Sequence, residues 1–203
     1  MMRLELIVEE PSMEEALRHL LPRIVHGRAD WKLINMRSKD RLLKRLPDRL
    51  RAYAARIKSG EDLKIIVLVD RDSDDCHELK RKLEQMARNA GLPTKSCPDD
   101  DGVFRVMNRI AVVELESWFM GDTEALRKTF GKLRGARFPS SFTNPDNGGT
   151  WERLHRFLKQ HGIYRSSYPK IEAARKIAPH LDPAHNLSRS FRVFCSGIEA
   201  CLS

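Results

Sequence analysis

Acidic residues follow three separate apolar segments of the sequence, and carboxylates placed in this way can share a divalent cation. Glu9 follows the first segment, and Asp70 and Asp72 follow the longest. Glu114 and Glu116 follow the third. Two unit charges roughly 4 Å apart repel each other by about 4 kcal/mol at an effective dielectric constant of about 20, and a bound cation removes that cost. Because the ligands would be hard oxygens without a cluster of His or Cys, the pattern favours Mg²⁺ or Mn²⁺ over zinc.

These apolar segments have the composition of buried strands. Residues 64–69 (KIIVLV) are apolar on both faces and rich in β-branched side chains, which is typical of a central strand in a parallel sheet covered by helices. Further strands are predicted at 4–8, 103–107 and 110–113. Amphipathic helices are predicted in the intervening segments, at 12–24, 40–58 and 76–90. Because ligands of open α/β sheets bind beyond the carboxyl ends of the strands, we expect the acidic residues to meet at one edge of the sheet.

The chain changes character beyond Gly121, where only helices are predicted. They fall at 122–130, 150–160, 171–178 and 190–202. Residues 138–149, between the first two of these helices, are rich in Pro, Ser, Asn and Gly and are predicted as a long mobile loop. We therefore expect an α/β core with a mostly parallel sheet flanked by helices over residues 1–130, and a helical C-terminal extension packed on that core over residues 131–203.

The charge is unevenly distributed along the chain, whose formal net charge is +9. Residues 1–60 carry 14 basic and 8 acidic side chains, residues 61–130 carry 11 and 15, and residues 131–203 carry 12 and 5. Lys and Arg release condensed counterions from phosphates, so the basic flanks favour DNA or RNA as a partner, although a solvated basic surface explains the same charge. The residues expected to contact a phosphate backbone, or the charge developing on it, are Arg41, Lys44, Arg45, Arg71 and Lys80.

The composition also excludes several classes of protein. The longest apolar run is only Ile65–Val69, and the N-terminal residues lack an apolar stretch before a small-residue cleavage site, so neither a membrane-spanning nor a secreted chain is expected. The four cysteines form no CxxC pair, which argues against a zinc site and for reduced thiols. We therefore predict a cytoplasmic protein. No pattern predicts its oligomeric state.

Two other phosphate- or metal-binding motifs are absent. Asp70, Asp72 and Asp74 repeat the opening of an EF-hand calcium loop, but Asp75 and Arg81 stand where that loop needs Gly and Glu. The sequence also has no Gly-rich phosphate loop with its lysine, which excludes a nucleoside triphosphatase of that type.

Four blocks of the chain are similar to one bacterial family. The blocks are residues 8–14 (VEEPSME), 68–76 (LVDRDSDDC), 108–119 (with NRI and ELESWF) and 190–194 (SFRVF). Together they resemble the domain-of-unknown-function family DUF4276 over nearly the whole chain. The strand that ends at Glu9 and the strand that ends in the Asp70-x-Asp72 motif also resemble the Toprim fold of topoisomerases, bacterial primases and the overcoming-lysogenization-defect (OLD) nucleases.

The resemblance implies a Toprim-like core that uses Mg²⁺ or Mn²⁺ to hydrolyse phosphodiester bonds of nucleic acid. Glu9 would be the conserved acid, as general base or metal ligand, and Asp70 and Asp72 would hold one or two metal ions. Glu116 is expected as a further ligand, with Glu114 as the second choice. Some relatives of this type are encoded beside ATPases in phage-defence or mobile-element loci, so the resemblance also implies an ATPase partner.

Two other functions are compatible with these residues. Toprim sequences usually have glycine after the glutamate, where this chain has Glu10, and this change permits a catalytically silent Toprim-like module that only binds nucleic acid or a partner. A phosphoacceptor receiver domain also clusters carboxylates on a parallel sheet. Receivers carry a single acceptor aspartate after the third strand and a lysine after the fifth, whereas here an Asp-x-Asp pair follows the long apolar strand and no later strand ends in lysine.

Overall fold

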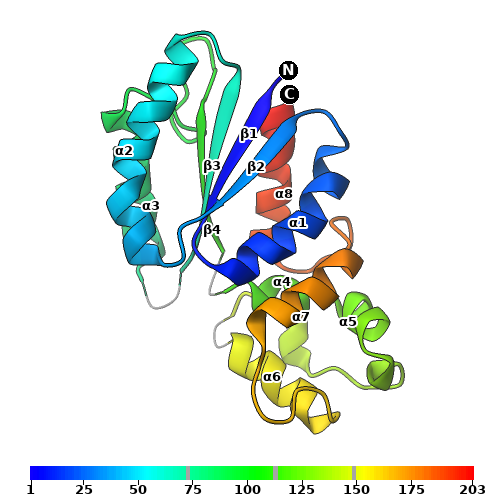
Figure 1. Cartoon of the computed structure of the whole chain (residues 1–203). Coiled ribbons are helices and arrows are strands. Elements are labelled where there is room, and N and C mark those ends of the chain that lie inside the picture. The colour runs from blue at the N-terminus through cyan, green and yellow to red at the C-terminus, as the bar shows by residue number, and fades with distance from the viewer. Residues whose placement is uncertain (72–73, 112–113, 148–149) are drawn as a thin grey trace.

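The computed structural model describes residues 1–71, 74–111, 114–147 and 150–203, and its centre is a parallel β-sheet (Figure 1). The strands are β1 (Arg3–Val8), β2 (Asp30–Asn35), β3 (Leu63–Asp70) and β4 (Val106–Ala111). They lie in the order β2-β1-β3-β4, and all neighbours are parallel. In the register of the sheet, Val8 is paired with Leu68, and Asp70 is paired with Ala111. The carboxyl ends of the strands therefore meet at one edge, as predicted.

Helices cover both faces of this sheet (Figure 1). On one face lie α1 (Pro11–Val25) and α8 (Arg189–Leu202). On the other face lie α2 (Lys39–Lys58) and α3 (Cys76–Asn89). The predicted fold class, an α/β protein with a parallel sheet flanked by helices, is confirmed.

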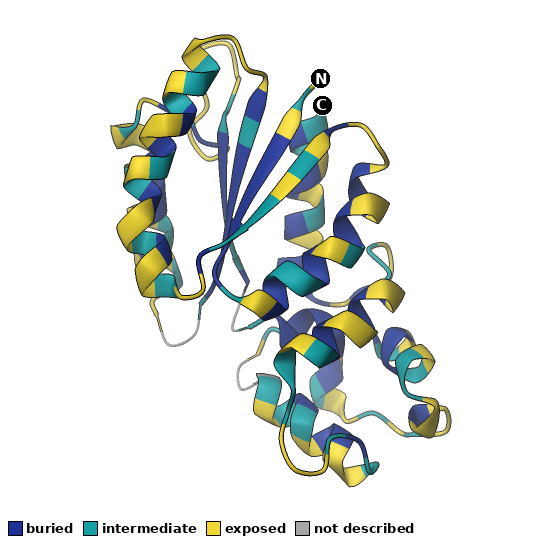
Figure 2. Cartoon of the chain, in the orientation of Figure 1, coloured by how far each residue is buried: buried dark blue, intermediate teal, exposed yellow. Residues whose placement is uncertain are grey.

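The central strand β3 is buried on both sides by these helices, as Figure 2 shows. Ile66 and Leu68 belong to the core shared with α1 and α8. The alternate residues Ile65 and Val67 belong to the core shared with α2 and α3. Each position of the strand thus has an apolar partner layer, which explains its uninterrupted apolar sequence. Full burial of one such side chain stabilises the fold by roughly 1.5–3 kcal/mol.

Further helices follow β4 and lie beyond the carboxyl edge of the sheet (Figure 1). They are α4 (Glu116–Met120), α5 (Thr123–Thr129), α6 (Thr150–Gln160) and α7 (Lys170–Ile177), with short 3₁₀ turns at Gly131–Leu133, Ser140–Phe142 and Ala178–His180. Within the described residues, none of the helices combines the length and the apolar composition needed to cross a membrane. The helix α7 packs against α1, and α8 then returns to the sheet, which gives the predicted helical C-terminal extension. The domain division at residue 130 stays a prediction.

Trp118 of α4 connects the last helix to the rest of the core. Its ring centroid lies 4.9 Å from that of Phe191 and 5.1 Å from that of Phe194, both on α8. Its indole N–H donates a hydrogen bond to Ser190 Oγ at 3.1 Å. The sequence block 190–194 is therefore explained by packing against α4.

Two of the predicted strands differ from the structure, and one observed strand was missed. Segments 103–107 and 110–113 were predicted as separate strands, but β4 is continuous from Val106 to Ala111, and residues 112–113 lie outside the described part of the chain. The strand β2 was not predicted. It lies at the edge of the sheet, where Asp30 and Lys32 are exposed and the other residues are only partly buried, so its sequence DWKLIN lacks a continuous apolar run.

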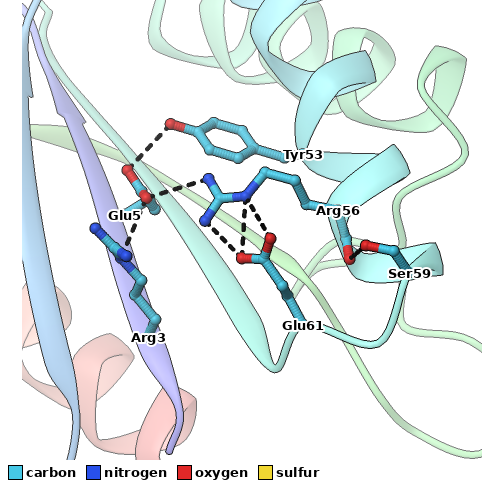
Figure 3. Close-up of polar contacts among 6 residues, drawn as sticks. All are labelled: Arg3, Glu5, Tyr53, Arg56, Ser59 and Glu61. Atoms are coloured by element: carbon cyan, nitrogen blue, oxygen red, sulfur yellow. Dashed lines mark hydrogen bonds and ion pairs between the residues drawn. The ribbon is translucent and has the colours of Figure 1, made fainter.

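Glu5, near the start of β1, connects α2 to the sheet (Figure 3). Its side chain is buried, and it accepts hydrogen bonds from the Tyr53 hydroxyl at 3.2 Å and from Arg56 Nη1 at 3.3 Å. Arg3 forms a further ion pair with it at 3.3 Å, and Arg56 also binds the Glu61 carboxylate at 2.6 Å. Burial, together with the charge of Glu5, raises the pKa of Tyr53 to about 12. We call these five residues the Glu5 cluster.

Candidate active site

Glu9 and Asp70 lie side by side at the carboxyl edge of the sheet. Glu9 is the first residue after β1, and Asp70 is the last residue of the neighbouring strand β3. The backbone N–H of Asp70 donates a hydrogen bond to Glu9 Oε2 at 3.1 Å. Both residues are buried, with relative exposures of 7% and 3%. The structure thus brings together two of the three acids predicted as the centre of the site, and the third, Asp72, lies outside the described residues.

Glu116 is the first residue of α4 and is more deeply buried than Glu9 and Asp70. It is 1% exposed, and its Oε1 has no hydrogen-bond partner among the described residues. Burial raises the pKa of Glu116 to about 7, against the opposing influence of the Lys170 ammonium. Glu114, two residues earlier, accepts a hydrogen bond from the backbone N–H of Trp151 at 3.0 Å. Glu114 therefore contacts the first turn of α6, where the positive end of the helix dipole favours a carboxylate.

Lys170, the first residue of α7, interacts electrostatically both with acids that follow β4 and with acids at the ends of β1 and β3. Burial by itself lowers the pKa of an ammonium group, but the charges of Glu116, Glu10, Glu114 and Asp70 outweigh burial and raise the pKa of Lys170. Its Nζ lies 3.6 Å from Glu10 Oε1. Acids that follow three different strands are thus within the electrostatic reach of one cation. Sequence reasoning missed Lys170, because nothing in the local pattern of α7 distinguishes it from the other lysines of the chain.

Tyr168 also faces this group of acids. Burial raises the pKa of Tyr168 well above its ordinary value, and the Glu116 carboxylate adds to this shift. The Tyr168 ring stacks against Trp151, with 6.5 Å between the centroids. The segment before α7 therefore closes one side of the Glu116 environment with aromatic rings.

The side chains at this edge of the sheet are of the chemical type that binds a divalent cation. Carboxylate oxygens are the preferred ligands of Mg²⁺ and Mn²⁺, and the buried Glu116 Oε1 has coordinating capacity that no described residue uses. Within the described part of the chain, however, no three Asp, Glu, His or Cys side chains are close enough together to form a complete metal site. Glu9, Asp70 and Glu116 are consequently candidate ligands of a site that the described residues only partly assemble.

The other predicted residues take different positions. Lys80 donates a hydrogen bond to the Asn108 carbonyl at 2.7 Å and pairs with Glu84 at 2.7 Å, so it supports β4 from α3. Arg71 follows Asp70, and its carbonyl accepts a hydrogen bond from Lys39 Nζ at 3.2 Å. Its own Nε is buried without a hydrogen-bond partner among the described residues.

The predicted phosphate-binding residues of α2 divide into two groups. Arg41 and Arg45 line a cavity of about 410 Å³ that also includes Arg49 and Asn35. Lys44 is exposed on the same helix but does not line this cavity. The arginines recur at intervals of four residues, so the helical period could have distinguished the two groups.

Comparison with known proteins places the chain in a family. A comparison with curated proteins finds no similar sequence. Among solved structures, the chain is similar to the C-terminal region of the Burkholderia pseudomallei OLD protein, with a TM-score of 0.49 and 16% sequence identity over 100% of both chains. The family profile described as "Domain of unknown function (DUF4276)" matches residues 8–199. The protein therefore belongs to the DUF4276 family.

Proposed function

We propose that the protein is a divalent-metal-dependent phosphodiester hydrolase that acts on nucleic acid. The observation that carries this proposal is the hydrogen bond between the backbone of Asp70 and the carboxylate of Glu9, which holds two buried acids from adjacent parallel strands together at the ligand-binding edge of the sheet. Two carboxylates from adjacent strands that lie side by side repel each other, so cation binding explains this placement better than stability does.

Each acid receives a role in this proposal. Glu9, Asp70 and Asp72 would hold Mg²⁺ or Mn²⁺, and Glu116 and Glu114 would be the further ligands. When bound, the cation would polarise the scissile phosphodiester and favour attack by water. The backbone hydrogen bond from Asp70 keeps the Glu9 carboxylate oriented toward β3, so it is positioned before substrate binds.

Lys170 has two roles in the same proposal. Its ammonium offsets the repulsion among the carboxylates, which permits them to lie near one another in the absence of substrate. When a phosphodiester binds, the same positive charge stabilises the negative charge that develops on the phosphate oxygens. Arg71, which follows Asp70, is the second candidate for this electrostatic role.

The family resemblance supports the finer parts of the proposal. We infer from it a bacterial, cytoplasmic protein that acts in phage defence or in a mobile-element context, with an ATPase as partner. These inferences depend on the resemblance of the sequence blocks to DUF4276 and to Toprim nucleases, and they stand independently of the geometry of the Glu9 and Asp70 pair.

A catalytically silent binding module is the second candidate. It is favoured by one observation of the sequence, namely that Glu10 stands where Toprim sequences usually have glycine. In that case Lys170 would act as a permanent counterion for the acids, and the protein would bind nucleic acid or a partner without cleaving it.

A cleavage assay separates the two candidates. Purified wild type and Asp70→Asn would be incubated with single- and double-stranded DNA and with RNA, in the presence of Mg²⁺, Mn²⁺ or EDTA. We expect metal-dependent cleavage by wild type and none by Asp70→Asn. Asp74→Asn is the matched control, because Asp74 lies four residues after Asp70 but is half-exposed and paired with Lys39 at 2.8 Å. Absence of cleavage by wild type, or full cleavage by Asp70→Asn, would contradict the hydrolase.

A further inference from the structure

We propose that a basic groove between α2 and the edge strand β2 binds the sugar-phosphate backbone of a nucleic-acid strand and leads it to Glu9 and Asp70. Two cavities of about 410 and 220 Å³ form this groove, and they adjoin because Arg49 lines both. The inference rests on the proposed function, since it assigns a path to the substrate of that site.

The groove is lined mainly by cationic side chains. Arg41, Arg45 and Arg49 line it from α2, and Lys32 lines it from β2. The guanidinium groups of Arg41 and Arg45 form no hydrogen bond or ion pair with another described residue. Their charges are therefore available to a ligand, and a guanidinium binds phosphate oxygens through two parallel N–H groups.

The acidic residues that border the groove are already engaged. Glu5 is the centre of the Glu5 cluster, where Arg3 and Arg56 compensate its charge (Figure 3). Asp48 forms an ion pair with Arg51 on the same helix. Because both carboxylates have cationic partners, the groove keeps a net positive potential.

The spacing of the arginines suits a polymer of phosphates. Arg41, Arg45 and Arg49 are four residues apart, so each step along α2 advances about 6 Å. Successive phosphates along an extended nucleic-acid strand are separated by a similar distance. Arg41 and Arg45, followed by Arg49, whose side chain also contacts Tyr53, can therefore bind three consecutive phosphates without reading the base sequence.

The edge strand leaves the other wall of the groove open. Among the described residues, β2 pairs only with β1, so the backbone groups on its outer edge have no neighbouring strand. Figure 2 shows exposed positions both on β2 and along the outer surface of α2. Five cationic side chains line the groove, including Arg56 of the Glu5 cluster, and they favour a polyanion over an added peptide strand as the occupant.

One end of the groove adjoins the candidate active site. Asn35 and Met36, which line the groove, lie at the carboxyl end of β2. The backbone N–H of Met36 donates a hydrogen bond to the carbonyl of Val8 at 2.9 Å, and Val8 immediately precedes Glu9. A nucleic-acid strand that follows the arginines toward the start of α2 therefore reaches the carboxyl end of β2. This end lies next to the end of β1, which Glu9 follows.

Binding measured in EDTA tests the groove separately from cleavage. Fluorescently labelled single-stranded DNA, single-stranded RNA and duplex DNA would be titrated with wild type and with a groove variant that carries Arg41→Gln, Arg45→Gln and Arg49→Gln. The control variant removes the same number of charges from the exposed surface of α3, with Arg81→Gln, Lys82→Gln and Arg88→Gln. A third variant replaces the three groove arginines by lysine. Circular dichroism checks that every variant is folded.

We expect the groove variant to bind roughly a hundredfold more weakly at about 0.1 M salt, with a slope of log affinity against log salt that is shallower by about 2. The lysine variant should retain most of the affinity, and the α3 control should change it by less than about threefold. The preferred oligonucleotide then identifies DNA or RNA as the source of the phosphates.

Three results would overturn the groove. They are an unchanged affinity of the groove variant, an equal loss in the α3 control, and a wild-type chain that binds no oligonucleotide, including the case in which it forms dimers through β2 instead. Cleavage is measured in a separate reaction with metal. A groove variant that loses binding, beside a wild type that binds but never cleaves, would reject the hydrolase while the groove stands.

Discussion

The two ends of β1 carry buried glutamates whose neighbouring side chains differ in charge. At the amino end, Glu5 is surrounded by partners, because Arg3, Arg56 and Tyr53 all contact its carboxylate (Figure 3). At the carboxyl end, Glu9 lies beside another acid, and its oxygen accepts a hydrogen bond from the backbone of Asp70. The first arrangement satisfies a buried charge, whereas the second concentrates negative charge at one edge of the sheet.

The difference indicates which buried acids serve the fold and which serve chemistry. A carboxylate compensated by guanidinium groups is stable as it stands and has little left to offer a ligand. At the carboxyl edge, the Lys170 ammonium lies within the electrostatic reach of four acids, and one of these, Glu116, has a pKa raised to about 7 by its burial. An edge with this excess of acids attracts further cations, and this attraction is what the proposed function uses.

The largest effect is expected from the matched pair Glu9→Gln and Glu5→Gln, since both residues are buried on or next to β1. Glu9→Gln should lower the metal-dependent cleavage rate by roughly a thousandfold or more, because it removes one charged ligand of the cation. Its fold should persist, since a glutamine oxygen can still accept the hydrogen bond from Asp70. Glu5→Gln should leave the cleavage rate of the folded protein unchanged. Equal losses of cleavage rate in both variants would show that Glu9 has no catalytic role that Glu5 lacks.

In stability, the larger effect is expected from Glu5→Gln and the smaller one from Glu9→Gln. Glu5→Gln should lower the free energy of unfolding by roughly 1.5–3 kcal/mol, because the buried Glu5 carboxylate accepts hydrogen bonds from Tyr53 and Arg56. Urea denaturation of both variants measures this difference. A Glu5→Gln protein as stable as wild type would show that the cluster does not hold α2 to the sheet.

A smaller effect is expected from the pH dependence of Glu116. Its folded-state pKa of about 7 lies above the ordinary value of 4.5, so the folded protein retains a proton that the unfolded chain loses. In metal-free protein, the contribution of Glu116 to stability should therefore fall as pH rises from about 4.5 to about 7, by at most roughly 3 kcal/mol. Compared with Glu116→Gln, wild type should lose stability over this window. A parallel pH dependence of the two proteins would contradict a buried, protonated Glu116.

The smallest effect is expected from Lys170→Met. The Lys170 ammonium lowers the pKa of Glu116, so its removal should raise that pKa further. The titration of the Glu116 carboxyl carbon, followed by NMR on ¹³C-labelled protein, measures the change. Lys176→Met on the same helix is the control, because Lys176 is exposed and pairs with Glu172. If both variants leave the titration of Glu116 unchanged, Lys170 does not connect the acids.

Much of the fold followed from local sequence patterns. The apolar run at 64–69 predicted β3, because a strand buried on both faces needs apolar residues at every position. The positions of Glu9 and Asp70 directly after strands predicted that they would meet, and parallel register makes this almost unavoidable. Edge position explains the missed strand β2. The helix α4 spans only Glu116–Met120 and is too short to display a helical period.

The features of the site that the sequence did not predict depend on segments that are distant in sequence but packed together in the fold. Lys170 is 100 residues from Asp70 in the sequence, and only the packing of α7 against α1 brings its ammonium toward the acids. The burial of Glu116 likewise depends on surrounding segments, such as the one that contains Tyr168. No pattern in a single sequence encodes such distances, whereas strand ends and helical periods are local and can be predicted.

Calorimetric titration with Mn²⁺ measures whether the acids at the carboxyl edge bind a divalent cation. The proteins compared are wild type, Glu9→Gln, Asp70→Asn and Glu5→Gln, in metal-free buffer. We predict that wild type and Glu5→Gln bind about one or two Mn²⁺ per chain, and that Glu9→Gln and Asp70→Asn lose this binding. Absence of binding by wild type, or undiminished binding by Glu9→Gln and Asp70→Asn, would show that Glu9 and Asp70 do not hold a divalent cation.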